Sequence, residues 1–215
     1  MKSAIIALIL STAALTSAHA SVISTLGIAE SATFDCLGTA SGCGQTFGQT
    51  FTVSNADTFL SNFTFSLTHV STNLKVVFDL FAWNGTNKVG PALFESAITA
   101  LDNSSGSQNV TFNPNSNLTQ GQTYIAFLNT ALPGNNSNKD SGFNVVSDAS
   151  YSGGSFLWQR TAGDSTWNNY GYDAKFAATF ASPVPAAAVP EPATGALLGL
   201  GLLGFLVSRR KSAKK

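Results

Sequence analysis

Carboxylates, rather than histidines or thiols, are the side chains of this sequence that could carry acid–base chemistry. Five of them fall in its middle and later parts: Asp79, Glu95, Asp148, Asp164 and Asp173. Two such groups facing each other across a sugar would serve as the acid and the nucleophile of a glycoside hydrolase. Sequence spacing does not fix their distances in space, and acids of this kind also suit turns and strand edges. We therefore expect no enzymatic activity and keep a glycoside hydrolase as the less favoured alternative.

Other catalytic and metal chemistries lack their residues. The two histidines are His19 and His69, and no serine lies in a Gly-x-Ser-x-Gly pattern, so no catalytic triad is indicated. His-Glu-x-x-His zinc motifs and phosphate-binding glycine loops are also absent from the sequence. Residues 102–104 and 140–142 supply oxygen atoms, but without the dense aspartate spacing of a calcium loop. We expect no cofactor, with a calcium ion between loops as the open alternative.

Aromatic residues near predicted turns offer a different chemistry, the stacking of flat rings on sugars. Residues 167–172 read Trp-Asn-Asn-Tyr-Gly-Tyr, in which amide groups accompany three rings: Trp167, Tyr170 and Tyr172. Such rings present an apolar face together with a polar group. Trp83 and Trp158 also lie beside turns, where they could equally cap a hydrophobic core. The three aromatics of residues 167–172 are thus candidates for glycan binding, and packing at the rim of the core is the alternative.

Apolar residues that alternate with polar ones predict β-strands along the body of the chain. The clearest sets are Phe47, Phe51 and Val53, then Phe59, Phe63, Phe65 and Leu67, then Val76, Phe78 and Leu80. Later runs follow at residues 92–98, 109–112, 123–128, 143–146, 155–159 and 172–180. Clusters of Asn, Gly, Ser and Pro separate these runs, and no segment of the body has a sustained helical period. About nine short strands of this kind predict an all-β fold, an antiparallel β-sandwich resembling a jelly roll.

The N-terminus has the features of a secretory signal peptide. Lys2 precedes an apolar run from residue 4 to residue 15, and Ala18-His19-Ala20 fits a small-x-small cleavage site. The apolar run is too short for a retained membrane helix. We expect residues 1–20 to be removed after Ala20 and the mature chain to be exported, so that His19 plays no part in its function.

Cys36 and Cys43 are the only two cysteines. In an exported protein a cysteine pair is by default a disulfide, and Gly38, Gly42 and Gly44 allow the segment between them to close into a loop. A metal or redox role is disfavoured, because six intervening residues do not make a Cys-x-x-Cys spacing. We expect a structural disulfide bond.

Three ordered elements occupy the C-terminal end of the sequence. Pro190-Glu191-Pro192 is followed by thirteen uncharged residues, 195–207, and then by Arg209-Arg210-Lys211. The prolines keep Glu191 in extended backbone that a processing enzyme can reach. Thirteen helical residues span about 20 Å, less than the roughly 30 Å of a hydrocarbon core, so a transmembrane helix here is marginal and depends on snorkelling of the cations.

This arrangement resembles the PEP-CTERM sorting signal, which bacterial exosortases recognise and process. The resemblance covers residues 189–211 and implies exosortase as a partner. It also implies an inner-membrane-anchored precursor and delivery to the surface or extracellular matrix of a Gram-negative bacterium that makes exopolysaccharide. A simple C-terminal membrane anchor on a proline-rich stalk is the alternative. Residues 181–188 are then a Pro/Ala-rich linker, and residues 21–180 a β-sandwich domain that resembles the small sandwiches commonly found before such signals.

Without its two terminal segments the chain is acidic and sparsely charged. Residues 21–180 hold ten acidic and five basic side chains, a net charge of −5, whereas the whole chain is balanced. Nucleic acids and anionic membrane surfaces need a clustered basic face, so neither is expected as a ligand of the body. We expect a non-catalytic body associated with exopolysaccharide, and the alternative is a carbohydrate-binding module that uses exposed aromatics.

Overall fold

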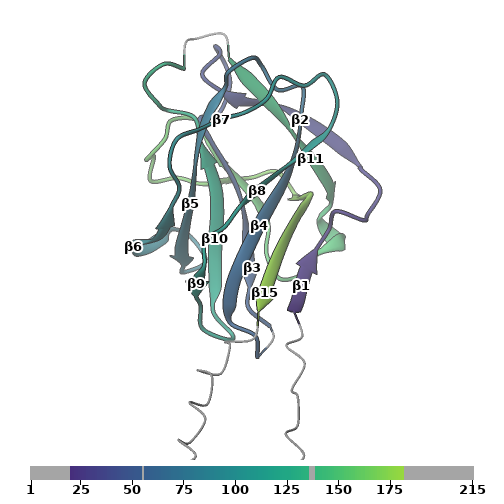
Figure 1. The fold of residues 1–215 in the computed structure, drawn as a ribbon, viewed down its shortest axis with the longest axis vertical. Coiled ribbons are helices and arrows are strands. Elements are labelled where there is room, and N and C mark those ends of the chain that lie inside the picture. Colours follow the sequence, from purple (N-terminus) through teal and green to yellow (C-terminus); the bar gives the residue numbers. More distant parts are fainter. Residues whose placement is uncertain (1–19, 55, 136–138, 182–215) are drawn as a thin grey trace, which may run out of the picture. The chain divides into compact units, whose positions relative to one another are not determined.

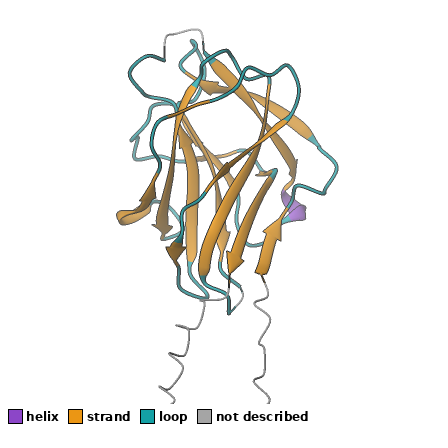
Figure 2. Cartoon of the chain, in the orientation of Figure 1, coloured by secondary structure: helices purple, strands orange, loops and turns teal. Residues whose placement is uncertain are grey.

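Two antiparallel β-sheets packed face to face form the body of the protein. The computed structural model describes residues 20–54, 56–135 and 139–181 (Figure 1). Strands dominate this part of the chain, and its helical content is one short 3-10 turn, η1 at Asp148–Ser150 (Figure 2). The strands described pair antiparallel in both sheets. The predicted all-β antiparallel sandwich is confirmed, whereas the predicted C-terminal helix lies outside the described residues.

The eight-stranded sheet is built around β4, which has neighbours along both of its edges. On one edge β4 pairs with β15 and, at its C-terminal end, with β11; on the other edge it pairs with β8 and β9. β1 extends the sheet beyond β15, while β2 and β14 both pair with β11. The strands are β1 (Ala20–Ser24), β2 (Ala32–Gly38), β4 (Phe59–Thr68), β8 (Gln108–Phe112), β9 (Ser116–Asn117), β11 (Asp140–Ser147), β14 (Tyr172–Ala174) and β15 (Phe176–Ala181).

The seven-stranded sheet carries the surface described below as the candidate site. Its order is β13-β12-β3-β10-β5-β6, and β7 pairs with the start of β5. The strands are β3 (Thr46–Thr52), β5 (Lys75–Trp83), β6 (Lys88–Glu95), β7 (Thr99–Ala100), β10 (Thr123–Asn129), β12 (Phe156–Gln159) and β13 (Asn168–Asn169). The edge strand β6 is mostly exposed and contains Pro91, which has no N–H to offer to a neighbouring strand.

Phenylalanine rings fill the space between the two sheets. In β10 the side chains of Tyr124, Ala126 and Leu128 point into this core, as the alternation of the sequence predicts. Rings from the two sheets meet there: Phe47 of β3 stacks on Phe143 of β11 with centroids 5.8 Å apart. Burying one such side chain stabilises the fold by about 1.5–3 kcal/mol. The core therefore holds the two sheets together, and the outer face of each sheet takes no part in this packing.

A β-bulge in β4 changes which side chains face this core. The alternation predicts that Phe59 points inward together with Phe63 and the residues after it. Pairing with β15 shifts register between Thr179 and Phe180, so that Leu60 is fully buried and Phe59 is only partly buried. The inward prediction is confirmed for Phe63, Phe65 and Leu67 and is wrong for Phe59.

The chain enters and leaves the body at the same end. All of β1 pairs with residues 177–181 of β15, with Ala20 opposite Ala181 (Figure 1). Neither β1 nor β2 is predicted by the alternation, because β1 is short and lies at an edge, and β2 mixes apolar and polar residues without a clear period. The predicted signal peptide, at residues 1–20, and the linker and sorting segment beyond residue 181 fall almost wholly outside the described residues.

Candidate functional site

A second apolar cluster lies on the face of the seven-stranded sheet that points away from the core. Ile125, Phe127 and Leu157 are buried in it, because alternate side chains of β10 and β12 point to this face. Three larger rings pack over them: Phe81, Trp83 and Trp167. We call these six residues the outer cluster. Lys88 adds to its cover, with Nζ 4.6 Å from the centre of the Phe81 ring.

A pocket of about 250 Å³ lies beside the outer cluster. Trp83 and Trp167 line it with their indole rings at 88° to each other and their centroids 5.7 Å apart. Its other lining residues come from β3, from the β5–β6 turn, from β12 and the residue before it, and from β13: Thr50, Gly85, Thr86, Ser155, Leu157 and Asn169. The lining is thus aromatic and polar, and none of these side chains ionises.

Hydrogen bonds hold the β5–β6 turn in shape. Oδ1 of Asn84 accepts hydrogen bonds from the backbone N–H groups of Thr86 and Asn87 at 2.9 and 2.8 Å. The Asn87 amide, oriented so that its nitrogen faces carbonyl oxygens, donates to the backbone oxygen of Ser165 at 2.7 Å. This last bond ties the turn that follows Trp83 to the loop that precedes Trp167.

The loop that carries Trp167 is braced at several further points. Gln159 donates from Nε2 to the backbone oxygen of Asp164, and the Asp164 carboxylate accepts from the N–H of Thr161 at 3.1 Å. The N–H of Ala162 donates to Oε1 of Gln45 at 3.0 Å. β13 then pairs with β12, which places Asn169 opposite Leu157. Residues 160–169 are therefore fixed on the sheet in a defined conformation.

Several polar groups of the pocket have no partner in the part of the chain that the structure describes. Neither the hydroxyl of Thr86 nor that of Ser155 takes part in a hydrogen bond there, and neither indole N–H of Trp83 and Trp167 donates one. Oδ1 of Asn169 accepts from the N–H of Gly171 at 2.7 Å, which leaves the amide nitrogen free to donate. The pocket therefore offers both donors and acceptors to a neutral ligand.

Two of the predicted carboxylates lie opposite each other on the same outer face. Asp79 of β5 faces Glu95 of β6 in the strand register, and Asp79 is only 6% exposed whereas Glu95 is exposed. Burial, with a smaller contribution from the Glu95 charge, raises the pKa of Asp79 to about 6, against an opposing effect of Lys88. Neither residue lines the pocket. The pair thus lies on the outer face, where Asp79 is opposite Phe127 in the strand register, but does not form part of the pocket wall.

The remaining carboxylates lie elsewhere in the fold. Asp173 is fully buried between the sheets, where its carboxylate accepts hydrogen bonds from Nε2 of Gln49 at 2.9 Å and from the N–H of Tyr151 at 3.1 Å. Burial raises its pKa to about 6 in spite of these bonds. Asp148 belongs to η1, and Asp164 caps the loop described above. Of the five acids considered as a possible glycosidase pair, the structure places Asp79 opposite Glu95, and Asp148 close enough to Asp173 for its charge to contribute to the raised pKa of Asp173.

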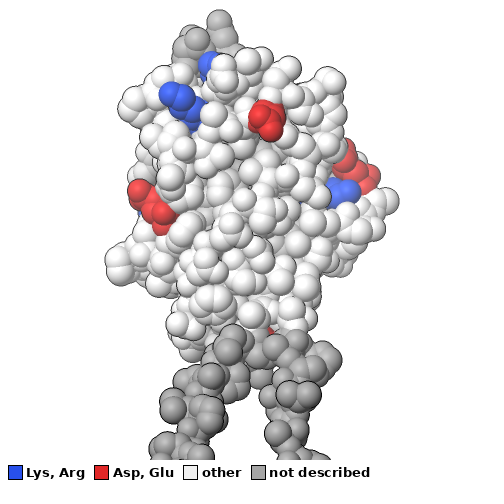
Figure 3. Space-filling model, viewed as in Figure 1, with Lys and Arg blue, Asp and Glu red and all other residues white. Residues whose placement is uncertain are grey.

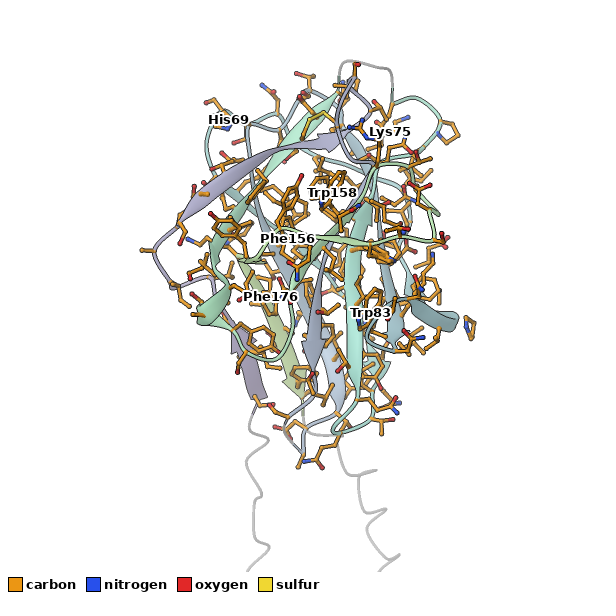
Figure 4. The ribbon with its side chains drawn as sticks, turned by 180° about the vertical axis from the view of Figure 1, so that it is seen from behind. His69, Lys75, Trp83, Phe156, Trp158 and Phe176 are labelled. Atoms are coloured by element: carbon orange, nitrogen blue, oxygen red, sulfur yellow. A yellow bond between two sulfur atoms is a disulfide. The ribbon has the colours of Figure 1, made fainter. Side chains whose placement is uncertain are left out.

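The three aromatics predicted as a glycan surface do not share one location. Trp167 lies on the outer face, but Tyr170 and Tyr172 pack against the core, where Phe34 stacks on Tyr170 at 4.3 Å and meets Tyr172 edge-on at 5.3 Å. Trp158 also packs on the core beside Tyr170. Figure 4 shows Trp158 beside Phe156, well away from Trp83. The rings that the structure places against Trp167 are Phe127 and Trp83, with centroids 5.4 and 5.7 Å away, both from distant parts of the sequence.

The pocket also contains residues that the sequence does not reveal as functional. Thr50, Thr86, Ser155 and Asn169 are ordinary polar residues of strands and turns in a chain rich in such residues. Among the pocket residues outside 167–172, Trp83 is the one that the sequence marks as a possible surface aromatic, because it ends an alternating strand immediately before the turn at residues 84–87. Its approach to Trp167 depends on tertiary structure.

Cys36 and Cys43 form a disulfide bond, as predicted. The bond closes the connection between β2 and β3, where the N–H of Gly44 donates to the oxygen of Cys36 at 3.0 Å and the N–H of Gly38 donates to the oxygen of Gly44 at 2.9 Å. Within residues 20–54, 56–135 and 139–181 no three His, Cys, Asp or Glu side chains gather in a group that could hold a metal ion. Asp140, considered above for calcium, accepts a hydrogen bond from the hydroxyl of Ser71 at 2.9 Å.

The predicted sorting residues Pro190, Glu191 and Pro192 and the basic cluster Arg209, Arg210 and Lys211 lie outside the described residues. A family model of the PEP-CTERM protein-sorting motif matches residues 188–211. The chain carries a PEP-CTERM signal. This signal marks an exported protein that is targeted to exosortase as its processing partner. Among the described residues, no helix is long and apolar enough to cross a membrane.

Comparisons with whole proteins are less specific. No curated protein matches the chain. A solved structure of the clostridial cysteine protease Cwp84 after propeptide cleavage matches at 15% identity with a TM-score of 0.52, over 76% of this chain and 40% of that one. Another, of the cysteine protease and lectin-like domains of Cwp84, a surface layer associated protein of Clostridium difficile, matches at 14% identity and a TM-score of 0.44, over 64% of this chain and 32% of that one. The chain thus spans well under half of the solved structures it matches, and the likeness concerns the fold alone.

Proposed function

We propose that this protein is delivered to the cell surface or extracellular matrix after exosortase processing, and that its non-catalytic β-sandwich body associates there with exopolysaccharide. The observation that carries the proposal is the PEP-CTERM signal at residues 188–211. This signal implies export and processing by exosortase. Retention of the mature protein at the surface or in the matrix would then depend on interactions made by the body.

The surface of the body supports association with an uncharged polymer. Its few charged side chains are scattered over the face seen in Figure 3, without a basic cluster. With a net charge of −5, the body would be repelled by a polyanion such as a nucleic acid. A neutral polysaccharide meets no such barrier.

Carbohydrate binding by a defined site is the specific form of this proposal that the geometry favours. The pocket of Trp83 and Trp167 combines two large rings with hydroxyl and amide groups that are not used in the fold. A glycoside hydrolase receives less support, because neither Asp79 and Glu95, which face each other in the strand register, nor Asp148 and Asp173 line this pocket.

Cell fractionation tests the proposal. The mature protein should sediment with the exopolysaccharide of wild-type cells and appear in the medium of an otherwise identical strain that makes no exopolysaccharide. A chain lacking residues 190–215 provides the control for sorting, since it should be exported without exosortase processing. An unchanged distribution of the mature protein between the two strains would refute association with the polysaccharide and leave the sorting signal unaffected.

A further inference from the structure

We propose that the pocket between Trp83, Trp167 and the β5–β6 turn binds one pyranose unit of a neutral polysaccharide. This inference rests on the proposed function and gives it a site and a ligand class. The site differs from the one that the sequence predicts, because it contains Trp167 but neither Tyr170 nor Tyr172.

The angle between the indole rings favours a sugar over a flat ligand. Because the planes of Trp83 and Trp167 meet at 88°, a planar aromatic molecule could lie flat on only one of them. A pyranose ring has apolar C–H faces and a rim of hydroxyl groups. It can place a face on one indole while its rim reaches the polar groups beside the other.

The polar groups of the pocket match such a rim. The hydroxyls of Thr86 and Ser155 can each donate and accept, and the Asn169 amide nitrogen can donate while its oxygen stays bonded to Gly171. None of these three groups is used by another contact among the described residues, so binding would break no existing bond. A ligand without hydroxyl groups would leave them unpaired at a cost in free energy.

The charge of the site selects neutral sugars. No ionisable side chain lines the pocket, and the nearby Lys88 ammonium lies over the rings of Phe81 and Phe127, at 4.6 and 5.4 Å from their centres. Nothing in the lining would pair with the carboxylate of a uronic acid or with a sulfate group. The acidic body adds a long-range repulsion against such anions.

The size and rigidity of the pocket limit the ligand to a short segment. A volume of about 250 Å³ is below the usual range for drug-sized molecules, so one sugar ring is enclosed while the rest of the polymer remains in solvent. The Asn87–Ser165 bond and the pairing of β13 with β12 fix the walls before the ligand arrives. Preformed walls reduce the entropy lost on binding.

Calorimetric titration of the full-length chain, purified in detergent, with neutral hexasaccharides of glucose, galactose or mannose tests the site. We expect at least one of these probes to bind and a hexamer of galacturonic acid not to bind. Trp167→Ala and Trp83→Ala should each weaken binding tenfold or more, as is typical of central aromatic anchors. Trp83→Phe should retain part of the affinity.

Asn169→Asp separates binding from folding, in case the tryptophan variants are unstable. It keeps the oxygen that accepts from Gly171 but removes the amide donor, so we expect several-fold weaker binding. The matched control is Asn168→Asp, the neighbouring residue of β13, which is exposed, does not line the pocket and loses only a long bond of 3.5 Å from Nδ2 to the backbone oxygen of Trp158. It should bind as the wild type does, and both variants should melt within a few degrees of each other.

The outcomes distinguish the site from the broader proposal. If a neutral hexasaccharide binds equally to the wild type, Trp167→Ala and Asn169→Asp, the assigned pocket is wrong while association with polysaccharide stands. If only the galacturonic acid hexamer binds, the assigned ligand class is wrong. If no probe binds and the cellular distribution is also independent of exopolysaccharide, the inference and the proposed function both fail.

Discussion

At the scale of single residues, Asp79 and Asp173 are carboxylates whose burial disfavours their charged form. Asp173 is compensated by hydrogen bonds from Gln49 and Tyr151, whereas the carboxylate of Asp79 accepts none from the described residues. The pKa of each is raised to about 6, with burial as the largest cause. Both folded-state pKa values lie above the ordinary value of 3.8, so the folded protein binds more protons than the unfolded chain between pH 4 and 6. The stability gained by protonation is complete below about pH 4 and is lost as the pH rises through about 6.

We expect Asp79→Asn to stabilise the body at pH 7. The substitution removes a buried charge and its repulsion with Glu95, and a shift of about two pKa units corresponds to roughly 3 kcal/mol as an upper limit. Melting temperatures of the wild type and the variant at pH 4.5 and pH 7 measure the effect. The variant should melt higher at pH 7 and lose part of the wild-type decline between the two pH values.

Glu95→Gln is the matched control, because Glu95 is exposed and opposite Asp79. It should give a smaller stabilisation at pH 7, since it removes the repulsion but leaves the buried charge. Equal melting temperatures of the wild type and Asp79→Asn at pH 7, with the same pH dependence, would show that Asp79 is not destabilising in its charged form.

The residue scale also shows how far the sequence predicts the candidate site. Aromatic and amide residues at 167–172 direct attention to Trp167, which lies on the outer face, but period and composition cannot tell that Tyr170 and Tyr172 turn to the core. The turn at Gly171, which has a positive φ of 70°, lies between these two tyrosines. The meeting of Trp83 with Trp167 joins residues 84 positions apart, and no local pattern contains it. The Cys36–Cys43 bond, by contrast, follows from there being two cysteines in an exported chain.

At the scale of elements, β3 is the strand on which the outer face depends. Gly48 lies opposite Phe127 of β10 on one side and Leu157 of β12 on the other. A Cβ atom at this position would lie 2.5 Å from Cβ of Phe127 and would also clash with the backbone oxygen of Ala126. The absence of a side chain is what allows the two large residues of the outer cluster to approach across this strand.

Gly48→Ala should therefore destabilise the body by about 1–3 kcal/mol, the usual cost of overpacking. Thermal unfolding gives the measurement, with roughly 2–4 °C lost per kcal/mol for a domain of this size. Gly106→Ala is the matched control, because a Cβ there meets no atom within 4 Å, and its melting temperature should stay the same or rise. A Gly48→Ala protein as stable as Gly106→Ala would mean that the sheet shifts at no cost.

Elements are predicted well where alternation is regular and poorly where pairing interrupts it. The runs that contain Phe47–Val53, Val76–Leu80 and residues 123–128 are strands as predicted. Their inward-facing residues lie in the core between the sheets, whereas Ile125 and Phe127 of the last run lie in the outer cluster. The bulge that turns Leu60 instead of Phe59 toward the core arises from the register between β4 and β15, which are more than 110 residues apart in sequence. β1 forms a strand because it pairs with the edge of β15. The five residues of β1 alone do not predict this pairing.

At the scale of the whole molecule, the first and last strands of the body, β1 and β15, pair with each other. The outer cluster lies on the other sheet. β1 and β15 belong to the eight-stranded sheet, while the pocket belongs to the seven-stranded sheet and its connecting loops. The sorting signal and the pocket proposed to bind a sugar therefore lie in separate parts of the chain. Changes to the sorting signal should leave the fold and the pocket intact, and changes to the pocket should leave sorting intact.

Processing of the C-terminal signal tests the central claim most directly. Replacing Pro190, Glu191 and Pro192 by alanine makes the segment compatible with a helix and removes the recognition motif, whereas Pro183→Ala with Pro185→Ala changes nearby prolines and spares it. The measurement is the intact mass of the protein recovered from the membrane and from outside the cell. Our account predicts a shortened mature chain for the wild type and the linker control, and an exported but unprocessed, membrane-held precursor for the motif variant. Normal processing and release of the motif variant would contradict it.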